Sequence, residues 1–119
     1  MNATSNLRFE MGAGAEEASA CLRALSNPSR LLILCMLVEG EKSVGEIERE
    51  LGFGQAYVSQ QLARLRSEGI VEAERDGRSV RYRMSDTRIA PVIQTLYEQY
   101  CASGVSNAED AELSTDIRA

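Results

Sequence analysis

Histidine is absent from the 119 residues, and its absence removes several kinds of active site. Without an imidazole there is no Cys–His or Ser–His pair that could activate a nucleophile. Metal sites built on histidine are excluded for the same reason. The sequence also has neither a glycine-rich phosphate loop nor an HExxH motif. We therefore expect a protein that is not an enzyme, with no catalytic residue, cofactor or metal.

Long hydrophobic runs are also missing. The longest apolar run is the eight residues 31–38, far short of the roughly 20 that a membrane-spanning helix needs. The polar N-terminal region has no signal-peptide pattern. We expect a cytoplasmic protein whose three cysteines are thiols. The length and the apolar content of 44% are typical of one globular domain.

The net charge is −5, which argues mildly against a nucleic-acid-binding protein, but the charges are unevenly distributed. Residues 64–88 hold seven arginines against five acids, and the excess acid lies in 39–50 and after 106. If the chain binds DNA, its nonspecific affinity should be weak, and base contacts must provide the selectivity. An acidic protein with one neutral patch is the alternative.

The hydrophobic spacing predicts a mainly α chain with one small β-hairpin. The ends, residues 1–14 and 103–119, are expected to be a flexible segment and a disordered acidic tail. Helices are predicted at about 15–25, 28–38, 43–51, 55–68 and 91–102, and the hairpin within 71–84.

Local signals mark several of these helix ends. Asn27 and Pro28 form an N-cap followed by proline at the first helical position. Ser43 and Glu46 have the spacing of a capping box. A turn at 52–54 separates two short helices, so that residues 43–68 read as a helix-turn-helix.

The second of these helices is predicted to have an inward face of Val58, Leu62 and Leu65 and an exposed polar face opposite. An amide at Gln60 can bond an adenine edge bidentately, and a small residue at Ala56 lets the helix approach the groove closely. The alternative is an ordinary solvated helix face, which the exposed aromatic Tyr57 argues against. The candidate DNA-binding residues are Gln55, Ala56, Tyr57, Ser59, Gln60, Arg64 and, from the hairpin, Arg78.

Residues 76–77 have the Asp-Gly sequence of a two-residue hairpin turn. That register places Arg75 opposite Arg78 and Glu72 opposite Arg81. Like charges at opposed positions destabilise a hairpin, so the arginine pair favours a nearby phosphate, with Arg78 as the stronger candidate. Arg81 is interpreted as a structural partner of Glu72. The face predicted to pack inward consists of Val71, Ala73, Val80 and Tyr82.

These motifs together resemble the ArsR/SmtB family of winged-helix repressors. The resemblance covers residues 15–102 and implies a homodimeric winged helix-turn-helix that releases an imperfect palindromic operator when an inducer binds. Two departures are Gly54, where the family often has a capping serine, and the pair Gln60 and Gln61, where it often has two histidines. The segments that carry the resemblance are Asn27-Pro28-Ser29-Arg30, Ser43-Val44-Gly45-Glu46-Ile47, Gln55-Ala56-Tyr57-Val58-Ser59-Gln60-Gln61-Leu62, Gly69-Ile70-Val71 and Asp76-Gly77-Arg78.

The resemblance also bears on the inducer. Metal sensors of the family usually place Cys-x-Cys in the third helix, or His and Asp ligands in the last, and this chain has no cysteine in 43–51 and no histidine. Cys35 and Cys101 are instead similar in placement to the dithiol, reactive-sulfur-sensing subgroup (SqrR/BigR type). The resemblance implies that a disulfide or polysulfide bridge between them ends DNA binding and derepresses genes for sulfide oxidation and detoxification.

Several alternatives remain open. The same two cysteines could sense arsenite or another thiophilic agent, or could be independent core residues, because cysteine is often buried. The fold could also act on a protein partner instead of DNA. Cys21 falls on the inward stripe of the first helix and is interpreted as a packing residue.

Overall fold

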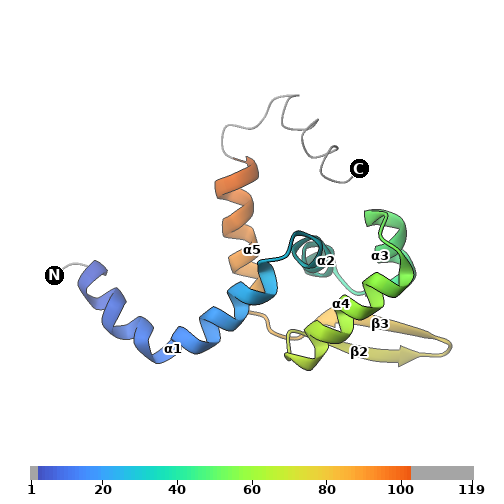
Figure 1. The fold of residues 1–119 in the computed structure, drawn as a ribbon, viewed down its shortest axis with the longest axis horizontal. Helices are drawn as coiled ribbons and strands as arrows, with labels where there is room; N and C mark the ends of the chain where they lie inside the picture. Colours follow the sequence, from blue (N-terminus) through green and yellow to red (C-terminus); the bar gives the residue numbers. More distant parts are fainter. Residues whose placement is uncertain (1–2, 103–119) are drawn as a thin grey trace. The chain divides into compact units, whose positions relative to one another are not determined.

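The computed structural model describes the backbone of residues 3–102 and the side chains of residues 6–101. The chain divides into two compact units, 1–31 and 32–119, which are described separately. The mainly helical class with a small sheet is confirmed (Figure 1). In order, the elements are α1 (Ala3–Leu25), α2 (Pro28–Glu39), β1 (Lys42–Ser43), α3 (Val44–Leu51), α4 (Gln55–Ser67), β2 (Val71–Asp76), β3 (Ser79–Met84), α5 (Ile89–Tyr97) and a π-helical turn (Glu98–Ala102).

In the first unit, α1 begins at Ala3 and not near Ala15, so the residues predicted to form a flexible segment are helical from position 3 onward. The prediction rested on the Asn, Ser, Gly and Ala content of this segment. Alanine is itself a good helix former, and each of the glycines at 12 and 14 costs a helix only about 1 kcal/mol. The alanines and glutamates around them are good helix formers. Propensity over the whole segment therefore outweighs the two glycines.

The junction after α1 forms as predicted. The Arg30 backbone N–H donates to Asn27 Oδ1 at 3.0 Å, which confirms the N-cap before Pro28. Arg30 is itself buried, and its Nε and Nη2 donate to the carbonyl oxygens of Ala24 and Arg23, both at 3.0 Å. The guanidinium thereby satisfies carbonyls at the C-terminal end of α1 that have no helical partner.

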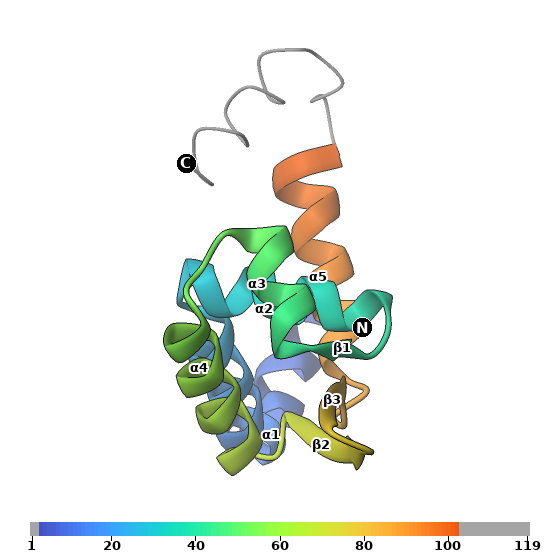
Figure 2. The same cartoon turned by 90° about the vertical axis from the view of Figure 1, so that its right-hand side faces the viewer.

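The core of the second unit is formed by buried side chains of α2, α3, α4, β2 and α5. Figure 2 shows α3 and α4 joined by the turn between them. The predicted inward face of α4, Val58, Leu62 and Leu65, is confirmed, each residue being 0% exposed. Ile47 of α3 is equally buried. On α2 the buried residues in this unit are Ile33, Leu34, Met36 and Leu37, whereas Val38 is exposed.

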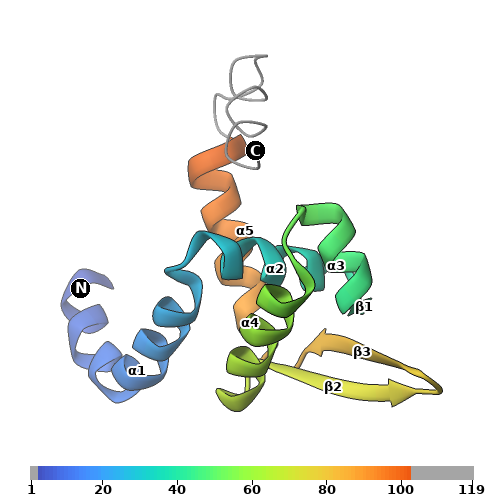
Figure 3. The same ribbon diagram turned by 45° about the vertical axis from the view of Figure 1, so that its right-hand side comes forward.

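The hairpin is part of a three-stranded antiparallel sheet with the order β1-β3-β2 (Figure 3). The additional strand β1 pairs Lys42 with Tyr82 and Ser43 with Arg81. Two residues are too few to show the alternation by which strands are recognised in a sequence. Strand β1 attaches the wing, defined here as β2, β3 and the turn between them, to the segment before α3.

The predicted hairpin register is wrong by two positions. Asp76 pairs with Ser79, so the turn residues are Gly77 and Arg78, and Arg75 lies opposite Val80 instead of Arg78. Gly77 has a φ of +66° and Arg78 does not have a positive φ, which is the arrangement of a turn with glycine at its first central position. Because the shift is an even number, Val71, Ala73, Val80 and Tyr82 still share one face.

The last helix differs from the prediction at both ends. It begins at Ile89, with Pro91 in its first turn. N–H groups of the first turn have no partner within the helix, so the lack of one at Pro91 costs no helical hydrogen bond. It ends at Tyr97 and continues as a π-helical turn that includes Cys101. The tail predicted for 103–119 lies outside the described residues.

No single helix in the described part of the chain is long and apolar enough to cross a bilayer; only α1 and α2 taken together, as a bent pair, reach that length and composition.

Candidate nucleic-acid interface

The orientation of α4 follows from the turn before it. Gly52 ends α3 in the left-handed conformation, with φ +75°, and its N–H donates to the Glu48 carbonyl at 2.8 Å. Gly54 then occupies the N-cap of α4 in an extended conformation, without a side-chain cap. The buried Val58, Leu62 and Leu65 set the rotation of the helix about its axis. The opposite face of α4 is therefore turned to solvent.

The structure places the predicted recognition residues together on this face. Tyr57 is 37% exposed, and Ser59, at the flank, is half-buried. The remaining exposed candidates are Gln55, Ala56, Gln60 and Arg64. This arrangement presents amides, a hydroxyl, a phenol and a guanidinium on one short helix, which are groups that contact base edges and phosphates.

Sequence reasoning missed the role of Phe53. Its ring lies edge-on to that of Tyr57, with centroids 5.7 Å apart and planes at 82°, a favourable aromatic geometry. The two residues are four positions apart, and this spacing was the available signal. Phe53 thus limits the positions that the exposed Tyr57 can adopt.

Arg64 forms an ion pair with Glu68, its Nε lying 3.4 Å from Oε2. Both side chains are exposed, and exposed pairs one helical turn apart contribute little to stability. The guanidinium can therefore exchange this partner for a phosphate at small cost.

The wing tip carries Arg75 and Arg78, which are both exposed. Within the described residues neither has a carboxylate at ion-pair distance. They are not cross-strand partners, so the predicted repulsion between opposed arginines is absent. Arg78 lies instead in the turn itself, at the end of the ribbon (Figure 3).

Arg81 has a structural role, as predicted, but with other partners than Glu72. It lies opposite Glu74 in the sheet, and its Nη1 is 3.2 Å from Glu46 Oε1. Glu72 is bound by Arg83, Nε to Oε2 at 2.8 Å. The sequence reasoning did not single out Arg83, because its role depends on the register.

Cys35 and Cys101 belong to the same unit, and the first is half-buried while the second is exposed. Burial raises the pKa of the Cys35 thiol, and the charges of Cys101 and Glu39 raise it further. Cys21, on α1, is half-buried.

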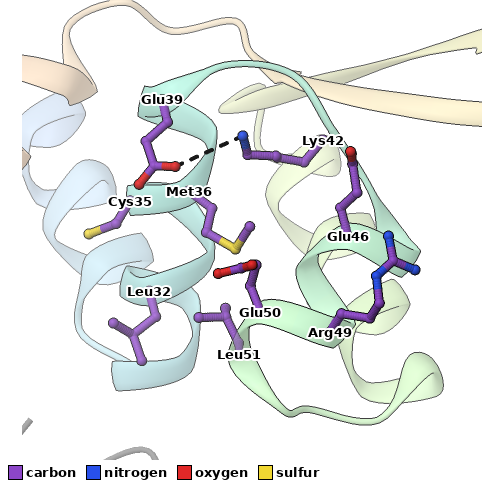
Figure 4. Close-up of a pocket in the computed structure, with 9 residues that line it drawn as sticks. All are labelled: Leu32, Cys35, Met36, Glu39, Lys42, Glu46, Arg49, Glu50 and Leu51. Atoms are coloured by element: carbon purple, nitrogen blue, oxygen red, sulfur yellow. Dashed lines mark ion pairs between the residues drawn. The ribbon is translucent and has the colours of Figure 1, made fainter. Parts of the chain in front are cut away.

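A groove of about 580 Å³ separates α2 from α3. In Figure 4 the Met36 side chain points into it, whereas the Cys35 sulfur lies on the other side of α2. Lys42 Nζ and Glu39 Oε1 lie 3.9 Å apart at one end. No group of three metal-binding side chains is found among the described residues. The groove is lined by Leu32, Cys35, Met36, Glu39, Lys42, Glu46, Arg49, Glu50 and Leu51.

Comparison with known proteins identifies the group to which this architecture belongs. Residues 27–73 match the model of the bacterial regulatory proteins of the arsR family. A biofilm growth-associated repressor of Xylella fastidiosa is 44% identical over 95 residues, which are 80% of this chain and 83% of the relative. The chain belongs to the ArsR family. Its membership makes it a DNA-binding transcriptional regulator, as the resemblance of its motifs predicted.

Other relatives and solved structures support the same family and fold. The regulator YgaV of Escherichia coli is 41% identical, covering 77% of this chain and 94% of the relative. The crystal structure of the repressor BigR from Xylella fastidiosa superposes with a TM-score of 0.77 at 44% identity, covering 81% of this chain and 98% of that one. The reduced form of HlyU from Vibrio cholerae gives a TM-score of 0.71 at 39% identity, covering 77% and 97%. The winged-helix fold is therefore confirmed.

Proposed function

We propose that the protein is a homodimeric repressor whose operator is released when reactive sulfur species bridge Cys35 and Cys101. The observation that carries the proposal is the placement of these two cysteines in one compact unit, Cys35 half-buried on α2 and Cys101 exposed in the π-helical turn after α5. The 44% sequence identity with a biofilm growth-associated repressor supports the proposed role in DNA binding.

The DNA contact is assigned to the exposed face of α4 and to the wing tip. A recognition helix of this size fits the major groove, and Arg78 at the end of a ribbon is suited to a phosphate or the minor groove. A structural neighbour from Mycobacterium bovis, 31% identical with a TM-score of 0.63, is described as a homodimeric winged helix-turn-helix domain. Two copies of α4 would then read the two halves of an imperfect palindrome. The contact residues are Gln55, Ala56, Tyr57, Ser59, Gln60, Arg64 and Arg78.

The sensing chemistry consists of two exchange steps. One thiolate attacks a dialkyl polysulfide R–S–Sn–S–R, forms a new S–S bond and releases RSH once the leaving thiolate is protonated. The second thiolate then displaces the other RSH. The products are two RSH molecules and a bridge in which n sulfur atoms join Cys35 Sγ to Cys101 Sγ, so the polysulfide is reduced and the protein oxidised without another reagent.

A bridge of variable length fits the two positions. A simple disulfide requires Cα atoms within about 7 Å, whereas inserted sulfur atoms span a wider gap. Because Cys35 is on α2 and Cys101 follows α5, the link would constrain two helices that flank the DNA-binding elements in the sequence. A small change in the spacing of two recognition helices is enough to lose one half-site. The regulated genes would be those for sulfide oxidation and detoxification.

The test measures intact mass and operator affinity on the same samples. The operator is a duplex selected from a random-sequence pool, and the reduced protein is treated with a dialkyl tetrasulfide, with hydrogen peroxide or with arsenite. We expect a Cys35–Cys101 crosslink carrying extra sulfur, together with loss of affinity, after the tetrasulfide. The Cys35→Ser and Cys101→Ser variants should bind DNA but not respond, while Cys21→Ser should respond like the unchanged protein.

Two results would contradict the proposal. Unchanged DNA binding after both thiols have been modified would remove the sensor role. Release by arsenite, with no release by the tetrasulfide, would make the chain an arsenite sensor that uses the same cysteines. Failure to select any duplex would favour a protein partner for this fold.

A further inference from the structure

One face of the wing carries a cluster of opposite charges, which we call the arginine clamp. It joins four segments: β2, β3, the two residues between α2 and β1, and the first turn of α3. Its members are Arg81 and Arg83 with the carboxylates of Glu41, Glu46, Glu72 and Glu74.

Arg83 is the centre of the clamp. Its Nε lies 2.8 Å from Glu72 Oε2, and its Nη1 lies 2.7 Å from Glu74 Oε1 and 3.4 Å from Glu41 Oε2. One guanidinium thus binds two carboxylates of β2 and a third in the segment before β1. The hydrogen bonds with Glu74 and Glu72 raise the pKa of Arg83 above its ordinary value. With three carboxylates around it, this arginine has little attraction left for a phosphate.

Arg81 extends the clamp to α3. Its Nη1 donates to Glu46 Oε1 and its Nη2 donates to the Glu41 carbonyl, both at 3.2 Å. The same Glu46 oxygen accepts the Ser43 N–H at 2.8 Å, within the capping box of α3. The wing is therefore tied directly to the helix-turn-helix.

Stability alone does not account for this cluster. The arginine side chains are about one-third exposed, at 32% and 37%, and exposed ion pairs singly contribute little to the free energy of folding. A two-stranded ribbon is by itself only marginally ordered, and β1 supports β3 through two residue pairs only. The direction of the ribbon consequently depends on contacts of its side chains with the rest of the unit.

We propose that Arg83 is a positioning residue for DNA binding, which holds the wing at the angle where Arg78 reaches the DNA without itself contacting DNA. The inference rests on the proposed function in that it takes Arg78 as the contact. It concerns the reduced protein only, so its outcome is independent of the sulfur chemistry.

The test is a double-variant cycle on the salt dependence of operator binding, with Arg78→Ala, Arg83→Gln and the combined variant. The slope of log K against log salt is negative, and losing one phosphate contact reduces its magnitude by about one. We expect Arg83→Gln to reduce this magnitude by about one when Arg78 is present, and to leave it unchanged in the Arg78→Ala protein. Arg83→Lys, which keeps the charge but not the planar fork, should restore only part of the affinity.

Arg88→Gln is the matched control, because it removes the same charge from an arginine that pairs with Asp86 outside the wing. It should leave the slope unchanged, and thermal unfolding should show that all variants are folded. Additive losses in the combined variant would overturn the inference, since Arg83 would then contact DNA directly. An unchanged slope in either single variant would overturn it as well.

Discussion

Gln60 lies at the centre of the exposed face of α4, where its side chain has no competing role in the buried core. An amide can donate to and accept from one adenine edge at the same time, and no other candidate on this helix face except Gln55 carries that pair of groups. Its neighbour Gln61 is half-buried. Base selectivity at this site should therefore depend on position 60.

Replacing Gln60 by alanine should weaken binding to the selected operator by about 1–3 kcal/mol and relax the base preference at one position in each half-site. Electrophoretic shifts with operators substituted at single base pairs measure both effects. Gln94→Ala, on α5, is the control and should bind normally. Equal losses on every sequence would show that Gln60 contacts only the backbone.

The raised pKa of the Cys35 thiol predicts how its rate of alkylation depends on pH. Burial is the largest cause of its raised pKa and Cys101 the next, so replacing Cys101 by serine should lower the Cys35 pKa without returning it to the ordinary value. A raised pKa means less thiolate, hence slower alkylation below it. Iodoacetamide rates followed by mass spectrometry across pH give the pKa, with Cys21→Ser as the control. An identical Cys35 profile in the Cys101→Ser protein would contradict the electrostatic link.

At the scale of the elements, the capping box connects the start of α3 with the wing. Ser43 Oγ accepts the Glu46 N–H at 3.1 Å, and Glu46 Oε1 accepts the Ser43 N–H and the Arg81 guanidinium. The hydrogen bond from the Ser43 backbone is the largest cause that holds the pKa of Glu46 below its usual range. This carboxylate therefore serves the helix and the sheet together.

Replacing Ser43 by alanine should destabilise the fold by about 1 kcal/mol, the usual value of an N-cap side chain.

Because the folded-state pKa of Glu46 is depressed, the stability that its carboxylate contributes is present above its ordinary pKa of 4.5 and is lost as the pH falls through the folded-state pKa. Glu46→Gln should accordingly flatten the fall in melting temperature between about pH 6 and about pH 3. Glu50→Gln, on the same helix, should retain the full fall; equal curves for the two variants would contradict the assignment.

At the scale of the whole molecule, charge opposes the proposed function. A net charge of −5 repels DNA, while the contacts on α4 and the wing tip attract it. The residues after 102 contain four acids and one arginine, so removing 103–119 changes the net charge from −5 to −2. Long-range repulsion acts on every DNA sequence alike.

Removing residues 103–119 should therefore strengthen binding to random-sequence DNA at low salt more than it strengthens the preference for the operator. Fluorescence anisotropy at several salt concentrations measures both affinities, and the difference should vanish at high salt. A control chain of the full length, with three of the four acids after 102 changed to their amides, also has a net charge of −2 and should behave like the shortened one. Loss of operator binding on truncation would show instead that the segment takes part in recognition.

The sequence by itself determined what depends on near neighbours: the caps at Asn27 and Ser43, the two helices within 43–68, the inward face of α4 with the exposed polar face opposite, and the family. Those features follow from spacing and from hydrogen bonds between residues a few positions apart. The start of α1 was predicted wrongly from the Asn, Ser, Gly and Ala content of the segment before residue 15, although helix propensity summed over that segment favours a helix. The partners of Arg81 and Arg83, the strand β1 and the register at Gly77 were decided only in the tertiary structure. Several of these contacts join residues 35 to 42 positions apart, such as Glu46 and Arg81 or Glu41 and Arg83. A shift of two positions in the register keeps the apolar face but exchanges every cross-strand partner, so no alternation of apolar residues could reveal it.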